Sequence, residues 1–328
     1  MVVENIIPIE NPLEWKKALK GIKHSFAHTW ENCHAMFLTT GFPTYLYTYK
    51  NGNIRIICPI AERTFMGYTD ITTPYGFSGF VGNRHCPGFP SHWDGFVKSR
   101  GYICGYIGLN PIFEDISFCK PDEIYQYHKI YIMDLTLTIS ELFRRLSINR
   151  KRELKHWDNS LSKITIDREV LVEFFLRHYH DFILSRSASK TYDFSYKTLS
   201  FLASLENVFI VGIQIDGKIE AVSVFAHTRD MGEFLFNVSL DKGRQYSALL
   251  IWYGIIHFKS MGIPYLNLGG GVKENDGVDR FKQRFGAKQF PLRCLKQVYD
   301  PKIYERLCRE CNADPNDRSG YFPPYHRQ

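Results

Sequence analysis

The sequence lacks the long apolar run of a transmembrane helix, and we expect no secretory leader. Residues 32–49 carry no formal charge, but Gly41, Pro43 and four threonines interrupt the stretch, so we expect strands there. The first twenty residues include Glu4 and Glu10 and have no long apolar core, which argues against a secretory signal. We therefore expect a cytoplasmic protein without a transmembrane segment.

Charge is also scarce, at 23% of residues, while hydrophobic residues make up 44% and aromatic residues 15% of the chain. This composition excludes disordered, collagen-like and coiled-coil proteins. With 328 residues, the chain is long enough for two modest domains or one large α/β domain. The net charge of +7 suits anionic partners such as phosphates, nucleotides or RNA without requiring them, and we expect no DNA partner.

The eight cysteines are scattered, as is typical of reduced, packed thiols in a cytosolic protein. A single CxxC motif joins Cys308 and Cys311, with no second motif to complete a zinc site. Zinc would also need His326 or Cys294, so we favour a frayed terminal helix and expect no metal.

Two hairpin signals stand 165 residues apart, about half of the 328-residue chain. In the first, residues 44–49 and 54–60 flank Asn51-Gly52, a pair that tolerates positive φ. In the second, residues 208–215 and 218–226 flank Asp216-Gly217. This spacing predicts two tandem copies of one α/β unit.

Helix signals accompany both hairpins. Pro12 follows a capping Asn11, and the segment from Thr138 to Glu141 has the spacing of a capping box. Further helices are expected over 167–184, 195–204 and 246–261, and strands over 233–238 and 264–268. We predict α/β (α+β) domains, each with a mixed, mostly antiparallel sheet flanked by helices, over 1–138 and 139–300, followed by a helix and tail over 301–328.

The most informative segment runs from Tyr265 to Gly286. A strand leads into Gly269, Gly270 and Gly271, then a charged loop, and then a helix expected over 278–285. Glycines at the end of a strand allow a ligand to approach the backbone, and a lysine on a short helix can hold a positive charge in place. A plain tight turn explains the glycines equally well, because the spacing matches no phosphate-binding motif.

Several motifs resemble those of the Fem-type aminoacyl and acyl transferases. These are Leu268-Gly-Gly-Gly, Phe281-Lys-x-x-Phe-Gly and, in the first half, the segment 73–79 with its Pro-Tyr-Gly-x-x-Gly pattern. Residues 248–252 and the basic segment 146–152 also match family segments, so the resemblance covers most of the chain. It implies tandem acetyltransferase-like (GNAT) domains and an acyl donor that meets an amine acceptor.

The resemblance also suggests site residues. Phe281 would lie at the donor end of the channel, and Lys282 would stabilise charge that develops during acyl transfer; the alternative is that Lys282 only pairs with Asp279. Asp279 and Asp70 are candidates for a general base by position alone, and capping or ion pairing is the alternative for both. The expected binding residues are Tyr75, Gly76, Gly79, Arg186, Lys190, Tyr192, Gly269, Gly270 and Phe281.

Two basic segments bear on the donor. Six cations lie between Arg144 and Lys155, a stripe that suits tRNA or a nucleotide diphosphate, or simply a solvated helix face. The loop 241–248 occupies the place of the coenzyme A pyrophosphate loop, but Gly243 and Tyr246 replace its leading cation and its glycine. This change disfavours coenzyme A and favours aminoacyl-tRNA or a carrier-bound acyl group.

We therefore expect an acyltransferase that moves an aminoacyl or acyl group onto an amine of a cell-wall precursor, glycan sugar or peptide. The donor would be a co-substrate, either aminoacyl-tRNA or acyl-coenzyme A or acyl-carrier protein, with no permanently bound cofactor. The acceptor would be an amine-bearing small molecule or nucleotide-linked precursor. The alternatives are an acyl-coenzyme A or carrier-protein dependent N-acyltransferase, and a non-catalytic module that binds a nucleotide-linked ligand.

Overall fold

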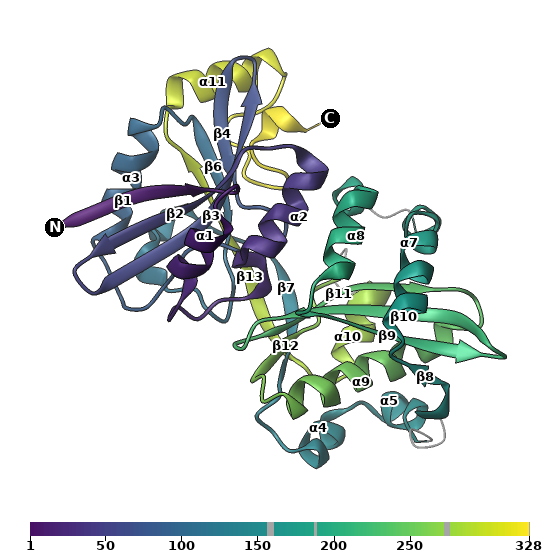
Figure 1. Cartoon of the computed structure of the whole chain (residues 1–328). Helices are drawn as coiled ribbons and strands as arrows, with labels where there is room; N and C mark the ends of the chain where they lie inside the picture. Colours follow the sequence, from purple (N-terminus) through teal and green to yellow (C-terminus); the bar gives the residue numbers. More distant parts are fainter. Residues whose placement is uncertain (156–160, 187–188, 272–275, 328) are drawn as a thin grey trace. The chain divides into compact units, whose positions relative to one another are not determined.

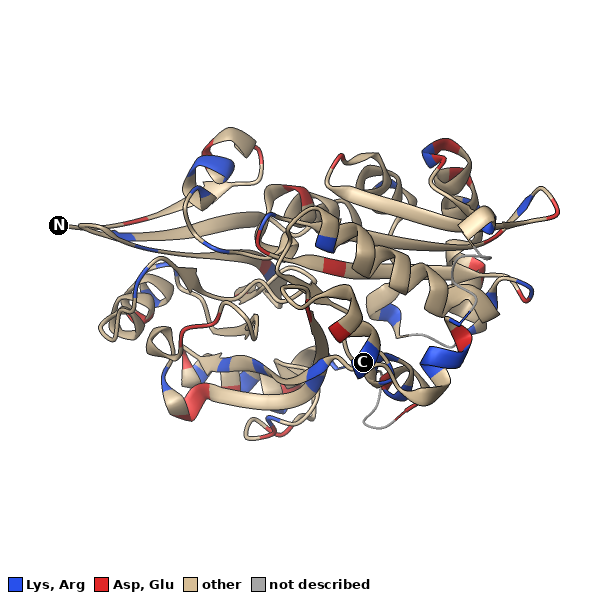
Figure 2. Ribbon diagram, turned by 90° about the horizontal axis from the view of Figure 1, so that it is seen from below, with Lys and Arg blue, Asp and Glu red and all other residues tan. Residues whose placement is uncertain are grey.

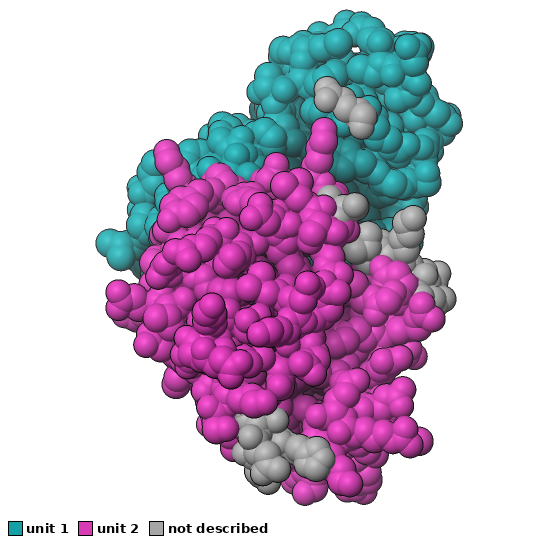
Figure 3. All heavy atoms as spheres, turned by 90° about the vertical axis from the view of Figure 1, so that its right-hand side faces the viewer, with its two compact units in different colours: residues 1–128, 291–328 teal, residues 129–290 magenta. Residues whose placement is uncertain are grey.

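The computed structural model describes residues 1–155, 161–186, 189–271 and 276–327. It divides into two compact units, which are labelled by element in Figure 1 and coloured separately in Figure 3. Unit 1 consists of residues 1–128 and 291–328, and unit 2 consists of residues 129–290. The chain passes from one unit to the other within strand β7 (Ile124–Asp134) and again within strand β13 (Lys288–Val298).

The other elements of unit 1 are β1 (Val2–Pro8), α1 (Pro12–Leu19), α2 (Trp30–Thr40), β2 (Thr44–Asn51), β3 (Ile54–Phe65), β4 (Tyr68–Thr72), β5 (Val81–Gly82), α3 (Phe89–Ser99), β6 (Cys104–Gly108) and α11 (Pro301–Glu310). Those of unit 2 are α4 (Ile139–Arg145), α5 (Ile148–Glu153), β8 (Ile164–Thr165), α7 (Arg168–Ser185), α8 (Tyr196–Ser204), β9 (Val208–Ile215), β10 (Lys218–His227), β11 (Gly232–Ser239), α9 (Ser247–Ser260), β12 (Tyr265–Asn267) and α10 (Gly277–Gln283).

The two sheets have the same strand layout. In unit 1 the order is β1-β2-β3-β4-β6-β13, and in unit 2 it is β8-β9-β10-β11-β12-β7. In each sheet one neighbouring pair is parallel, β4 with β6 and β11 with β12, and the other neighbours are antiparallel. A helix, α3 or α9, connects each parallel pair. The predicted fold class of mixed, mostly antiparallel sheets flanked by helices is thus confirmed.

The sixth strand of each sheet comes from the other half of the sequence. Strand β7 follows β6 along the chain but pairs with β12, and β13 follows β12 but pairs with β6. The units therefore differ from the predicted division into 1–138, 139–300 and 301–328. Residues 129–138 lie in unit 2, and residues 291–328, with α11, complete unit 1. Strand pairing between distant segments leaves no local signal in the sequence.

Local signals account for most element boundaries. The Thr138 side chain accepts a hydrogen bond from the Glu141 amide, and Glu141 closes the predicted capping box in return. Both predicted turns contain left-handed residues, Gly52 in the first and Asp216 and Gly217 in the second. Asn11 precedes α1 as expected, but its side chain forms no capping hydrogen bond.

The prediction of strands over 32–49 is wrong for residues 32–40, which belong to helix α2. The Thr29 side chain caps this helix by accepting a hydrogen bond from the Asn32 amide, and Gly41 ends it with φ of 67°. The buried Cys33 and Met36 lie three residues apart on one face of the helix. No helix in the described part of the chain is long and apolar enough to cross a membrane.

Helices cover both faces of the unit 2 sheet, as Figure 1 shows for α7 and α8 on one side and α9 on the other. Helix α9 packs into a core with Val211, Ile213 and Phe225 of the sheet. Gly212 points to the opposite face, where a Cβ atom would lie 2.2 Å from Leu171 Cδ2 of α7. Successive residues of β9 point to opposite faces of the sheet, so α9 packs on one face and α7 packs on the other.

Candidate functional site

Lys282 and the glycine turn after β12 form the centre of the candidate site. The Lys282 ammonium donates a hydrogen bond to the carbonyl oxygen of Gly270 at 2.7 Å. Gly269 has φ of +73°, and a Cβ atom there would lie 3.0 Å from Lys282 Nζ. At Gly270 a Cβ atom would lie 2.6 Å from the Lys129 carbonyl oxygen. A side chain at either glycine would therefore be strained. The structure places the predicted residues Gly269, Gly270 and Lys282 together.

Helix α10 positions this lysine. Its first turn is capped by the Asp276 carboxylate, which accepts a hydrogen bond from the Asp279 amide at 2.7 Å. Asp279 is 1% exposed. Residues 272–275, the rest of the predicted charged loop, lie outside the described residues.

Burial and the neighbouring carboxylates act on the pKa of Lys282 in opposite directions. Burial lowers the pKa of the Lys282 ammonium to about 8, while the negative charges of Asp276 and Asp279 act to raise it. Burial also raises the pKa of Tyr131 to about 12, helped by a hydrogen bond to Asp279. Tyr131 therefore remains a phenol at neutral pH, and Lys282 remains mostly a cation with two further N–H donors.

Phe281 has a role that the sequence did not reveal. Its ring and that of Phe285 enclose the guanidinium of Arg150, whose carbon lies 4.4 Å and 4.2 Å from the two ring centroids. Arg150 also donates a hydrogen bond to the Phe281 carbonyl oxygen at 3.1 Å and pairs with Glu153. Arg150 is only 1% exposed, so this member of the basic stripe anchors helix α10.

The predicted acceptor residues Arg186, Lys190 and Tyr192 lie at the end of α7 and in the turn before α8. Arg186 and Lys190 are exposed, and the Arg186 guanidinium lies 5.2 Å from the Phe182 ring centroid. The Tyr192 carbonyl oxygen accepts a hydrogen bond from the Tyr179 hydroxyl at 2.7 Å. This segment belongs to the α7 and α8 face of the sheet, whereas α10 packs into the core on the α9 face.

The predicted residues of the first half, Tyr75, Gly76 and Gly79, lie in unit 1 on the loop between β4 and β5. Gly76 has φ of +116°, and a Cβ atom there would lie 2.7 Å from Ala27 Cβ. The Gly79 carbonyl oxygen binds a ring nitrogen of His28 at 3.0 Å. Burial lowers the pKa of His28 to about 3, so this histidine is a neutral strut beneath the loop. Tyr75 is 39% exposed, with its backbone carbonyl bound by Asn32.

Asp70 is an ion-pairing residue. It pairs with Arg63 at 2.6 Å and accepts a hydrogen bond from the Tyr325 hydroxyl at 2.9 Å, and His326 lies at the same distance. Asp70 and Arg63 are 1% and 5% exposed, so they are buried together. This geometry matches ion pairing, the alternative to a general base at Asp70.

Neither the CxxC motif nor the loop before α9 forms a ligand site among the described residues. Cys308 is buried within an apolar cluster, and the described residues contain no group of three or more metal-ligating side chains. In the loop before α9, a Cβ atom at Gly243 would lie 2.0 Å from the Glu220 carbonyl oxygen, so this glycine serves packing. The Tyr246 hydroxyl accepts a hydrogen bond from Lys163 at 2.9 Å.

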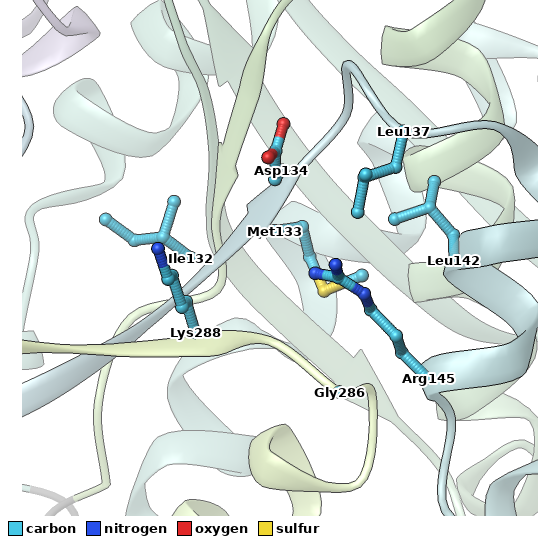
Figure 4. Close-up of a pocket in the computed structure, with 8 residues that line it drawn as sticks. All are labelled: Ile132, Met133, Asp134, Leu137, Leu142, Arg145, Gly286 and Lys288. Carbon is cyan, nitrogen blue, oxygen red and sulfur yellow. The ribbon is translucent and has the colours of Figure 1, made fainter.

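A cavity of about 120 Å³ lies on unit 2 beside β7 and α4. Figure 4 shows its eight lining residues, with Leu137 and Leu142 facing Ile132 and Lys288 across Met133 and Arg145. Asp134 is held by the Thr136 amide and hydroxyl at 3.1 Å and 2.6 Å. None of the predicted site residues lines this cavity.

No protein-family model matches the sequence, and no curated protein matches it. Among solved structures, FemX superimposes with a TM-score of 0.70 at 9% identity, covering 93% of this chain and 99% of FemX. The fold resembles that of FemX. The C-terminal domain of a putative lysylphosphatidylglycerol synthetase from Agrobacterium fabrum has a TM-score of 0.56 at 13% identity, covering 92% of this chain and 96% of that domain.

A further match is L-PGS from Bacillus licheniformis, with a TM-score of 0.55 at 13% identity. It covers 88% of this chain and 92% of that chain. The resemblance to Fem-type proteins predicted from the motifs is thus confirmed at the level of the fold, over nearly the whole chain.

Proposed function

We propose that this protein is an acyltransferase that forms an amide by moving an aminoacyl or acyl group onto an amine. The observation that carries the proposal is Lys282, a half-buried cation held against a glycine turn with its pKa lowered to about 8. The FemX-like fold, the glycine turn and the Phe281-Lys282 pair support the same function.

The reaction joins an amine to the carbonyl carbon of an ester or thioester. The amine nitrogen attacks, and the carbonyl electron pair moves onto oxygen to give a tetrahedral oxyanion. That pair then re-forms the carbonyl and expels the alkoxide or thiolate, which takes up a proton as the amine loses one. A preplaced cation in a site with little water lowers the oxyanion barrier by about 3 to 4 kcal/mol.

Lys282 has the properties for this role. One of its three N–H donors is used on Gly270, which fixes the ammonium and leaves two donors for the oxyanion. Asp279 acts as a positioning residue, because its charge helps to keep Lys282 protonated and its amide holds the helix cap.

We further propose aminoacyl-tRNA or a carrier-bound acyl group as the donor, used as a co-substrate. The loop before α9 supports this choice, because Tyr246 and its Lys163 partner stand where a pyrophosphate loop would need glycine. An amine of a cell-wall precursor, glycan sugar or peptide would be the acceptor.

The test is transfer by purified full-length protein, followed by mass spectrometry of the acceptors. Charged tRNA and acyl-coenzyme A are supplied as separate donors with amine acceptors and nucleotide-linked amino sugars. Lys282→Ala should lower the transfer rate about 100 to 1000-fold while donor binding is retained. Lys288→Ala, which removes an exposed lysine six residues further on, is the matched control and should leave the rate unchanged.

Three outcomes would contradict parts of the proposal. Full turnover by Lys282→Ala would remove Lys282 from the chemistry. Transfer only from acyl-coenzyme A would replace the proposed donor. Binding of a nucleotide-linked ligand with no transfer from any donor would make the protein a binding module.

A further inference from the structure

One part of the basic stripe lies outside the candidate site. Lys and Arg are spread over both units (Figure 2), but on α4 and α5 they border an apolar hollow. We call it the α4–α5 hollow; its lining residues are Phe143, Ile148, Lys151, Arg152, Leu154 and Lys155. Arg150, whose guanidinium lies between the rings of Phe281 and Phe285, is not among these lining residues.

The apolar residues of the hollow are unusually open to solvent. Ile148 is 70% exposed and Phe143 is 36% exposed, whereas Leu154 is buried. Ile148 stands at the first position of α5, so its side chain projects from the end of the helix. Exposed apolar residues that gather around one hollow indicate a binding surface rather than scattered surface residues.

The rim of the same hollow is positively charged. Lys151 and Arg152 lie three and four residues after Ile148, which places them beside it on the helix. Lys151 is fixed by a hydrogen bond to the Arg144 carbonyl oxygen at 2.8 Å. Arg152 and Lys155 form no ion pair with any residue of the described ranges. The nearby acid, Glu153, is already paired with Arg150.

We propose that the α4–α5 hollow docks the protein on the surface of an anionic phospholipid bilayer. Acidic headgroups complement Lys151, Arg152 and Lys155, and the upper acyl region accommodates Ile148 and Phe143. RNA is the other polyanion that would attract these cations. RNA fits less well, because Ile148, the more exposed of the two apolar residues, cannot stack on a base, and the Phe143 ring already packs edge to face on Trp252.

This inference is independent of the proposed transferase activity. It needs only the local structure of α4 and α5, and a catalytically inactive Lys282→Ala protein should bind vesicles as well as the native protein does. A failure to bind vesicles and a failure to transfer an acyl group are therefore distinguishable.

The test is co-sedimentation of the full-length protein with vesicles. Binding is expected to mixed phosphatidylcholine and phosphatidylglycerol vesicles, to weaken as salt is raised, and to be much weaker with phosphatidylcholine alone. Arg152→Glu/Lys155→Glu should weaken binding by about 25-fold or more, at about fivefold for each of the two cations. Ile148→Asp should weaken it by about tenfold, because a carboxylate cannot enter the acyl region.

Matched controls use surface residues elsewhere. Leu13→Asp replaces another exposed apolar residue, 82% exposed on α1, and Lys197→Glu/Lys218→Glu makes the same change in net charge within unit 2. Both controls should bind as the native protein does. Circular dichroism and thermal unfolding check that every variant is folded.

Two results would overturn the proposal. One is equal sedimentation of native protein and Ile148→Asp with anionic vesicles. The other is an absence of vesicle binding together with binding to bulk tRNA that Arg152→Glu/Lys155→Glu loses and Ile148→Asp retains, which would make the hollow an RNA surface.

Discussion

At the scale of single residues, Lys282 is costly to the fold. Its ammonium is withdrawn from water, and two nearby carboxylates compensate only in part, since its pKa falls from 10.5 to about 8. A residue that is unfavourable for stability but fixed by a hydrogen bond and two glycines is typical of a site shaped by function.

Lys282→Met should therefore stabilise the protein at pH 7 by about 1 to 3 kcal/mol while lowering the rate of the proposed transfer as Lys282→Ala does. Between pH 8 and 10.5 the unfolded chain holds a proton that the folded chain has released, so the free energy of unfolding of the native protein rises with pH. The advantage of methionine should be full below pH 8 and disappear towards pH 10.5. Urea unfolding across this range measures it.

Lys288→Met, at an exposed lysine, is the control and should change the free energy of unfolding little at any pH. An equal effect of both substitutions, or none at Lys282, would show that the Lys282 ammonium is hydrated in solution.

The proximity of Lys282 to Gly269 and Gly270 could be predicted, because a short helix with a lysine follows a glycine-rich strand end in the sequence. Arg150 was not predictable. It lies about 130 residues from Phe281, and only the fold brings its guanidinium between two rings. His28 was hidden for the same reason, since its partner Gly79 lies 51 residues away.

At the scale of elements, the sequence was sufficient to predict a helix or hairpin where a capping or turn residue marks its boundary. The hairpins, the capping box and the helices of the second half were predicted close to their observed bounds. Helix α2 was missed because its threonines and aromatic residues favour strands, while packing of Cys33 and Met36 into the core decides the outcome.

The contact of α7 with the sheet depends on Gly212, which has no side chain. Gly212→Ala should destabilise unit 2 by about 1 to 3 kcal/mol, because the new Cβ atom would lie 2.2 Å from Leu171 Cδ2 and 3.0 Å from the Ala221 carbonyl oxygen. Thermal or urea unfolding measures the loss.

Gly95→Ala provides the contrast. Gly95 lies within α3 and a Cβ atom there has nothing within 4 Å, so alanine should stabilise that helix by about 1 kcal/mol. If Gly212→Ala were as stable as the native protein, α7 would be free to shift away from β9 without loss.

At the scale of the whole molecule, the two units are repeats that exchange their last strand. The repeated order of six strands and the single parallel pair in each sheet agree with the predicted duplication. The exchange itself was not predictable, because it concerns which edge a strand joins, and an alternating pattern of apolar residues specifies a strand but not its neighbour.

Unit 1 is built from both ends of the sequence and unit 2 from one continuous segment, so separate fragments should differ in their ability to fold. Residues 1–128 lack β13 and α11, so Cys104–Gly108 lose their outer partner strand and Asp70 loses Tyr325 and His326. This fragment should fail to unfold cooperatively, and adding a peptide of residues 291–328 should restore cooperativity. Residues 129–290 contain all of unit 2 and should fold alone. Cooperative unfolding of residues 1–128 by themselves would contradict this expectation.

The position of β13 also sets an order of events on the ribosome. The first unit emerges early, yet its sheet stays unfinished, with the edge of β6 open, until the whole of the second unit has been translated. A nascent chain that stalls before residue 291 would therefore carry one finished unit and one exposed strand edge, the kind of edge that chaperones cover and proteases cut.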